Sequence, residues 1–200
     1  MANVVLRRAF VTGAALSIVL LAAGCGTPPW EEDAAAPTPA SSRSAVAPTP
    51  VPNDLSGGST QRELEAGAVV ATVDYWSSLD MGEWTADALK PLEISMTTTI
   101  TPADGQKVFL QRARMVAVPG TPAGDLAPLD AQTDAATVSP GYLVLSPYSY
   151  SQTFTVGALP EEATFVTLRL EYDFLVQATP TSSDYAKQTV TDVLTVALAR

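Results

Sequence analysis

Aromatic side chains stand beside carboxylates in one short stretch of the chain, and this is the first combination that could do chemistry. Trp76 and Trp84 supply the largest rings, with Tyr75 next to the first of them. The acidic residues around them are Asp74, Asp80, Glu83 and Asp87. An aromatic face beside a carboxylate suits a carbohydrate or a cationic ligand. Trp76 and Trp84 are therefore candidate ligand-binding residues. The alternative is that both tryptophans belong to the hydrophobic core and the acids are solvated.

A second group of acidic residues lies in a predicted long loop from Pro119 to Ser139. Its members are Asp125, Asp130 and Asp134. Carboxylate oxygens are calcium ligands, but the spacing of these three does not match the EF-hand loop. We therefore expect these aspartates to be solvated, and we predict no metal site and no cofactor.

The absence of histidine narrows the chemistry further. None of the 200 residues is a histidine, and one is a cysteine. Ser-His-Asp triads, Cys-His dyads and most zinc or copper sites need imidazole or thiolate groups. No Ser-x-x-Lys, Gly-x-Ser-x-Gly or phosphate-binding glycine motif occurs. The sequence predicts that the protein is not an enzyme. A less favoured alternative is an enzyme that acts on an envelope glycan through carboxylates.

The single cysteine, Cys25, lies where an apolar run ends. Arg7 and Arg8 precede an uncharged segment from Ala9 to Ala23. This order is typical of a secretory signal peptide, with a positive start, an apolar core and small residues before the cleavage site. The apolar segment is shorter than the roughly 20 residues of a membrane-spanning helix. We predict a signal peptide over residues 1–24.

The segment Leu21 to Cys25, with the sequence LAAGC, resembles the lipobox of bacterial lipoproteins. The family's usual leucine, three positions before the cysteine, is Ala22 here. The resemblance implies that Cys25 carries a diacylglyceryl group and that the signal is cut just before it. We therefore expect localisation at the cell membrane, lipid-anchored on the extracytoplasmic face. The Arg7–Arg8 pair also resembles the start of a twin-arginine signal, so the export route stays open.

Composition divides the rest of the chain into two parts. Residues 25–60 hold the lipidated cysteine and a linker rich in Pro, Ala, Ser and Thr, which we expect to be disordered. The linker is either a bare spacer or a carrier of O-linked sugar. Residues 61–200 form the predicted folded domain. Because the formal net charge is −10, we expect no nucleic-acid binding, and we expect bilayer contact through the acylated Cys25 alone.

Alternating apolar and polar residues predict a β-rich fold. The clearest strand runs from Val166 to Val176, and others are expected over 92–100, 107–118, 148–156 and 190–198. A change of phase near Arg112 indicates a β-bulge. Between residues 61 and 90 the pattern is ambiguous; a strand over 68–76 is favoured over a helix. Turn signals, including 118–124, separate these runs.

Several strands with turns between them predict an antiparallel sandwich of about seven strands. The pattern resembles the immunoglobulin-like sandwiches of many bacterial surface lipoproteins. We therefore expect a non-enzymatic binding or scaffolding module of the cell envelope, with an envelope protein or glycan as partner. The alternative is a ligand- or solute-binding lipoprotein, which an enclosed apolar pocket would indicate.

Overall fold

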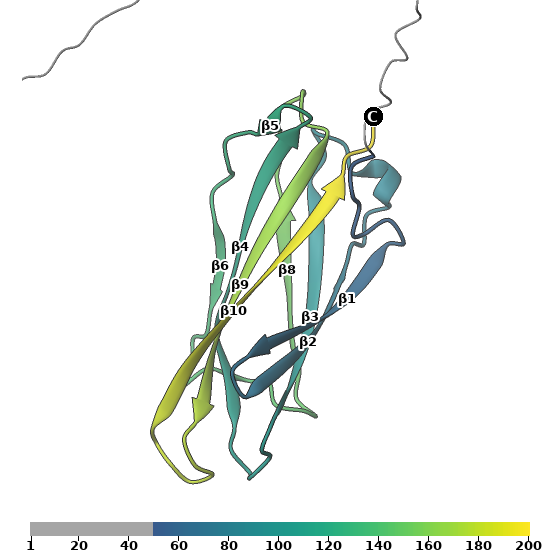
Figure 1. Cartoon of the computed structure of the whole chain (residues 1–200). Helices are drawn as coiled ribbons and strands as arrows, with labels where there is room; N and C mark the ends of the chain where they lie inside the picture. The colour runs from purple at the N-terminus through teal and green to yellow at the C-terminus, as the bar shows by residue number, and fades with distance from the viewer. Residues whose placement is uncertain (1–49) are drawn as a thin grey trace, which may run out of the picture. The chain divides into compact units, whose positions relative to one another are not determined.

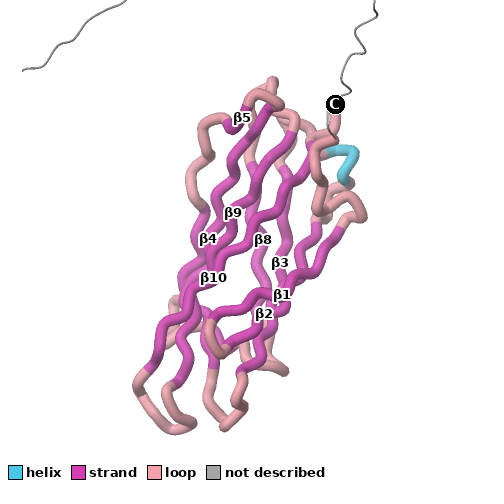
Figure 2. The backbone as a smooth tube through the Cα atoms, in the orientation of Figure 1, coloured by secondary structure: helices cyan, strands magenta, loops and turns pink. Residues whose placement is uncertain are grey.

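The computed structural model describes residues 50–200, which form an all-β domain (Figures 1 and 2). The predicted signal peptide, Cys25 and most of the predicted linker lie outside the described residues. One 3-10 turn, η1 (Met81–Glu83), accompanies the strands. The strands are β1 (Ser59–Ala66), β2 (Val69–Trp76), β3 (Lys90–Ile100), β4 (Val108–Thr121), β5 (Gly124–Asp125), β6 (Gln132–Ala135), β7 (Tyr142–Leu143), β8 (Tyr150–Val156), β9 (Phe165–Gln177) and β10 (Tyr185–Ala197).

The strands form two antiparallel sheets. One has the order β1-β2-β3-β8, and the other has the order β10-β9-β4-β5, with β6 and β7 also paired to β4. The orders β2-β3-β8 and β10-β9-β4 match the A-B-E and G-F-C strand orders of immunoglobulin-like sandwiches. β1 is an additional strand, which pairs with β2 at the edge of the first sheet. The described residues thus hold ten strands where about seven were predicted, because β5, β6 and β7 are short pairings along β4.

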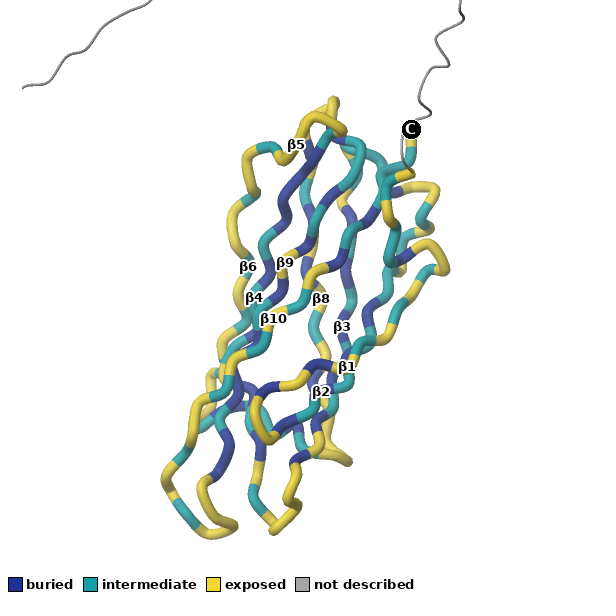
Figure 3. The backbone as a smooth tube through the Cα atoms, in the orientation of Figure 1, coloured by how far each residue is buried: buried dark blue, intermediate teal, exposed yellow. Residues whose placement is uncertain are grey.

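The alternation predicted for Val166 to Val176 is confirmed in β9. Val166, Leu168 and Leu170 are almost fully buried between the sheets, and Arg169 between them is exposed. The buried residues of both sheets form one continuous core, visible as the dark blue stretches of β3, β4 and β9 in Figure 3. Side chains on successive residues of a strand point to opposite faces, so a period of two buries one face. The strands expected over 68–76 and 92–100 are also present.

One residue of β9 departs from the expected pattern. Asp173 lies on the outward face but is only 2% exposed. Its carboxylate pairs with Arg112 at 2.7 Å and Lys187 at 3.1 Å, and Thr189 donates a hydrogen bond to it at 2.6 Å. Burial alone would raise the pKa of Asp173, but the hydrogen bonds from Thr189 and Lys187 and the charge of Arg112 outweigh it and lower the pKa.

The bulge predicted near Arg112 is confirmed. The pairing of β4 with β9 shifts register between Leu110 and Arg112. The extra residue lets Leu110 and Ala113 both reach the core, although they are separated by an odd number of positions. The change of phase in the sequence is the local signature of this bulge.

Two predicted boundaries are wrong. The turn expected at 118–124 is present but shorter, because β4 continues to Thr121 and pairs with β5 across residues 122–123; the expected loop 119–139 therefore contains β5 and β6. The ordered chain also starts before Gln61, since Leu55 is fully buried and β1 begins at Ser59. Proline and glycine signalled turns at both places, but pairing with neighbouring strands decided the local conformation.

The described chain enters and leaves the domain at the same end (Figure 1). The backbone N–H of Asp54 donates to the carbonyl of Thr195 on β10 at 2.8 Å. The N–H of Ala199 donates to the carbonyl of Trp84 at 3.0 Å. The turn that joins β3 to β4 and the turn that joins β9 to β10 lie at the other end, where Gly105 approaches Pro180.

Candidate functional site

The two candidate tryptophans have different fates, because Trp84 is a core residue. It follows η1 and is fully buried. Its indole N–H donates to Ser77 Oγ at 3.0 Å, so the polar atom of the ring is satisfied inside the fold. Ser77 Oγ in turn donates to the carbonyl of Pro91 at 2.7 Å. The prediction that Trp84 binds a ligand is therefore wrong: both its ring and its N–H are used in packing.

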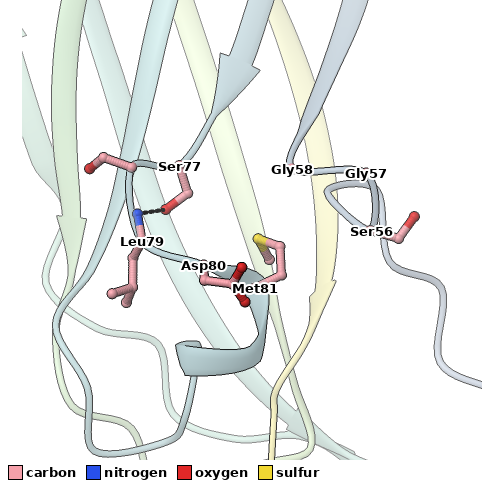
Figure 4. Close-up of a pocket in the computed structure, with 8 residues that line it drawn as sticks. Ser56, Gly57, Gly58, Ser77, Leu79, Asp80 and Met81 are labelled. Atoms are coloured by element: carbon pink, nitrogen blue, oxygen red, sulfur yellow. Dashed lines mark hydrogen bonds between the residues drawn. The ribbon is translucent and has the colours of Figure 1, made fainter.

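The loop that holds Trp84 borders a hollow with a volume of about 580 Å³ (Figure 4). The turn at Ser56–Gly58 forms one wall, and the segment from Ser77 to Met81 forms the other. Asp80 Oδ1 accepts from the N–H of Gly82 at 2.7 Å, and Leu79 N–H donates to Ser77 Oγ at 3.2 Å. These hydrogen bonds fix the turn, and none of the residues that line this hollow is aromatic.

Lys90 is a buried cation that sequence reasoning missed. Its side chain is fully buried at the start of β3. Nζ donates to four backbone carbonyls, those of Thr85, Ala86, Ala88 and Gly157, at 3.0, 3.3, 2.6 and 3.1 Å. Burial lowers the pKa of Lys90, and the charge of Asp87 opposes that change. The ammonium group ties the loop after η1 to the β8–β9 loop, so its role is structural.

Trp76, in contrast, lies on the outer face of its sheet. Tyr75 points inward, where its hydroxyl lies 3.1 Å from that of Tyr172, and Trp76 points outward and is half-buried. The strand pairing sets Trp76 opposite Glu93 on β3, and Glu93 opposite Thr153 on β8. A pocket of about 280 Å³ lies at this position, lined by Trp76, Glu93, Ile94, Ser151, Gln152 and Thr153.

A second pocket lies on the other side of β8 and was not predicted. The rings of Tyr142 on β7 and Tyr150 on β8 stack with their centroids 5.9 Å apart. The Tyr150 hydroxyl donates to Asp134 on β6 at 2.7 Å. Burial and then the hydrogen bond to Asp134 raise the pKa of Tyr150, which keeps the phenol neutral. The pocket has a volume of about 320 Å³, and its lining residues are Asp134, Tyr142, Ser149, Tyr150, Ser151 and Gln152.

The two pockets share Ser151 and Gln152, and we call this pair of neighbouring pockets the β8 groove. Trp76 lies on β2, beyond β3 from β8, and Tyr142 lies on β7, which pairs with β4 of the other sheet. Asp134 Oδ1 and Gln152 Nε2 have no hydrogen-bond partner among residues 50–200. Neither lysine nor arginine lines either pocket. The tyrosines of the segment GYLVLSPYSYS were the signal in the sequence, but only the fold shows which of them face the groove.

Three backbone groups on the free edge of β8 are already capped by side chains. The side-chain amide of Gln132 donates to the carbonyl of Thr155 at 2.6 Å and accepts from its N–H at 3.0 Å. Gln152 Oε1 accepts from the N–H of Thr153 at 2.8 Å. These side chains occupy the positions that a neighbouring strand would take.

The acidic residues singled out in the sequence do not assemble. Asp134 contacts Tyr150, and Asp125 pairs with Arg169 at 3.2 Å. Asp130 is exposed between them. Asp74 accepts from Gln61 at 2.7 Å on the outer face of its sheet. Within residues 50–200, no group of three or more potential metal ligands forms.

No family model matches the chain, and no curated protein is significantly similar to it in sequence. Among the described residues, no helix is long and apolar enough to cross a membrane. The β8 groove is therefore assigned from its own geometry, as the place where uncommitted aromatic and polar side chains meet.

Proposed function

We propose that the chain is a lipoprotein of the cell envelope, anchored through an acyl group on Cys25, and that its β-sandwich is a non-enzymatic binding module. The β8 groove is the observation that carries the binding role. It offers the rings of Trp76 and Tyr142 and the uncommitted polar atoms of Asp134 and Gln152 on strands of the two sheets. Binding sites typically combine apolar surfaces with a few placed polar groups in this way.

The sequence before residue 50 supports an anchored module, because LAAGC at 21–25 follows an apolar run and resembles the lipobox of bacterial lipoproteins. Within the described residues, the chain enters the domain beside β10, where Asp54 N–H donates to the carbonyl of Thr195. The turns at 101–107 and 178–184 lie at the opposite end of the domain (Figure 1).

Acylation is tested by metabolic labelling with an alkyne fatty acid. We expect the wild type to be labelled and to sediment with membranes, and Cys25→Ser to lose both properties. Equal labelling of the two proteins would overturn the anchor.

The binding role is tested by capture from the protein's own envelope fraction. The full chain and its Trp76→Ala variant serve as baits, and Tyr148→Ala is the matched control. Tyr148 is 57% exposed on the loop before β8 but lines neither pocket. We expect the wild type and Tyr148→Ala to retain the same envelope component and Trp76→Ala to lose it. Equal retention by all three would contradict a binding role for the groove.

A further inference from the structure

We propose that the β8 groove binds a linear oligosaccharide that is neutral or carries amino groups. The proposal rests on the proposed function for its source, an envelope glycan, but the groove itself is argued from its lining. Its two pockets, of about 280 and 320 Å³, meet at Ser151 and Gln152. A chain of sugar rings that crosses β8 at these residues would contact an aromatic ring on either side.

The aromatic residues are placed for stacking against the apolar faces of sugar rings. Trp76 is half-buried on the outer face of β2, where it lines the smaller pocket. On the other side, Tyr142 is half-buried and its ring stacks on Tyr150, whose hydroxyl is held by Asp134. A large ring that is already immobilised loses little entropy when a ligand packs on it.

The polar groups of the groove match a polyol. Asp134 Oδ1 is an acceptor, Gln152 Nε2 is a donor, and the hydroxyl of Ser151 is both. None of these three makes a hydrogen bond with another described residue. The hydroxyl groups of a sugar donate and accept alternately, so all three side-chain groups can find partners on one ring.

The acidic residues of the groove favour neutral or amino-bearing glycans over anionic ones. Glu93 and Asp134 line the two pockets, and no basic residue lines either of them. A uronic acid or a phosphate placed here would meet like charge without a counter-ion, which is unfavourable. An amino sugar would meet both carboxylates favourably, and its cation would lie beside the Trp76 ring.

The capped edge argues against a peptide in the same place. An extended peptide usually binds a sheet by adding a strand to a free edge. At β8 the side chain of Gln132 already pairs with both backbone groups of Thr155, and Gln152 pairs with the N–H of Thr153. Strand addition would first have to displace these hydrogen bonds, whereas a sugar needs only the side chains that face the groove.

The test is isothermal titration of the full chain, purified in detergent, with three tetramers: N-acetylglucosamine, glucosamine and galacturonic acid. We expect the first two to bind, glucosamine at least as tightly as N-acetylglucosamine, and galacturonic acid not to bind. Trp76→Ala and Tyr142→Ala should each raise Kd about tenfold. Tyr148→Ala, an exposed tyrosine outside both pockets, should leave Kd unchanged.

Binding that prefers the anionic tetramer, equal Kd values for wild type and both groove variants, or no heat with any tetramer would overturn the proposal. So would competition for the groove by a cationic extended peptide that binds more tightly than the sugars. Urea midpoints of the variants separate lost binding from lost folding, and Trp76→Phe, which keeps a ring, should retain part of the affinity. Because the titration does not depend on acylation, its failure is distinct from a failure of the Cys25 labelling.

Discussion

Strands β8 and β10 each leave one edge of a sheet unpaired, and the two edges are capped by the same two devices. At β8, Gln132 pairs with both backbone groups of Thr155, and Gln152 accepts from the N–H of Thr153. At β10, Asp54 accepts from the N–H of Thr195 at 2.7 Å through Oδ2, and its own N–H donates to the carbonyl of that residue.

The second device at β10 comes from its own strand. Asp192 Oδ1 accepts from the N–H of Val193 at 2.8 Å, as Gln152 does for the residue that follows it. Unpaired edges are templates for association with other chains, and side-chain caps remove them. Both edges are thus protected by a side chain from a distant segment and by one from the strand itself.

The chemistry of the caps differs, and the difference follows the surroundings. Neutral amides cap β8, where Glu93 and Asp134 already supply negative charge. Carboxylates cap β10, where Arg62 pairs with Asp54 at 2.7 Å and Lys187 pairs with Asp173. Cations next to β10 stabilise a charged cap. At β8 a third carboxylate would repel the other two, so an amide is the better cap.

The largest expected loss of stability comes from removing the buried carboxylate of Asp173. Asp173→Asn removes the carboxylate that pairs with Lys187 and one of the two that pair with Arg112, whose other partner is Glu171, from a site that is 2% exposed. We expect a loss of about 3 kcal/mol at pH 7, at the low end for a broken buried pair, because both cations can turn to solvent. Urea unfolding measures it. The control is Asp184→Ala, an exposed aspartate in the β9–β10 turn, which should cost less than about 0.5 kcal/mol.

The same variant tests how the contribution of Asp173 to the free energy of unfolding depends on pH. The pKa of Asp173 is lowered in the folded protein, so the folded state binds fewer protons there than the unfolded chain. Its contribution is complete above the ordinary aspartate pKa of about 3.9 and is lost as the pH falls below that value. The stability gap between wild type and Asp173→Asn should therefore narrow as the pH falls below about 4. A constant gap would show that the loss came from packing instead of charge.

The next effect concerns the charged cap of β10. Asp54→Ala removes the acceptor for Arg62 and for the N–H of Thr195. We expect a loss of about 2 kcal/mol, because two donors lose a charged acceptor. Amide exchange at Thr195 should accelerate, while exchange at Thr155 on the other edge stays as it was. Faster exchange at both edges would mean that the caps are not independent.

The neutral cap of β8 should contribute less. Gln132→Ala removes two neutral hydrogen bonds at an exposed edge, and we expect a loss of about 1 kcal/mol. Gln111→Ala, which changes an exposed glutamine of β4, is the matched control. Asp54→Ala and Gln132→Ala share no partner, so their effects should add. A Gln132→Ala loss larger than that of Asp54→Ala would reverse the comparison between the edges.

The contrast between the edges also shows what a single sequence can predict. β9 and the bulge at Arg112 were predictable because a period of two, and a break in it, are written in consecutive residues. The order of strands in a sandwich follows from that pattern only in outline. Trp76 and Trp84 look alike in the sequence. Trp76 ends on the outer face of β2, whereas Trp84 follows η1 and packs into the core, and only the fold distinguishes these two positions.

The caps and the groove could not be predicted because their partners are distant or carry no side-chain signal. Gln132 and Thr155 are 23 positions apart. Asp54 and Thr195 are 141 positions apart, and Asp54 lay in the predicted linker. The four oxygens around Lys90 are backbone carbonyls, which every residue has. Pairing across the fold, and not residue type, selects these contacts.

The smallest predicted effect comes from the caps that each strand supplies for itself. Gln152→Ala frees the N–H of Thr153 to bond with water, and we expect a loss of about 0.5 kcal/mol. Asp192→Ala frees Val193 N–H in the same way, but it also removes a buried oxygen, Oδ2, that interacts with the Tyr75 hydroxyl without forming a well-aligned hydrogen bond among the described residues. An unsatisfied buried acceptor costs about as much as the lost hydrogen bond contributes. Asp192→Ala should therefore leave the urea midpoint unchanged or raise it.

Amide exchange at Val193 and Thr153 measures whether each cap has been lost, independently of stability. Both amides should exchange faster in their own variant. If Asp192→Ala destabilises the domain more than Gln152→Ala, the carboxylate oxygen is satisfied in solution, and the two self-caps are not equivalent. If the two variants behave as expected, the Asp192 cap covers the edge of β10 without adding to stability, whereas the Asp54 cap of the same edge does both.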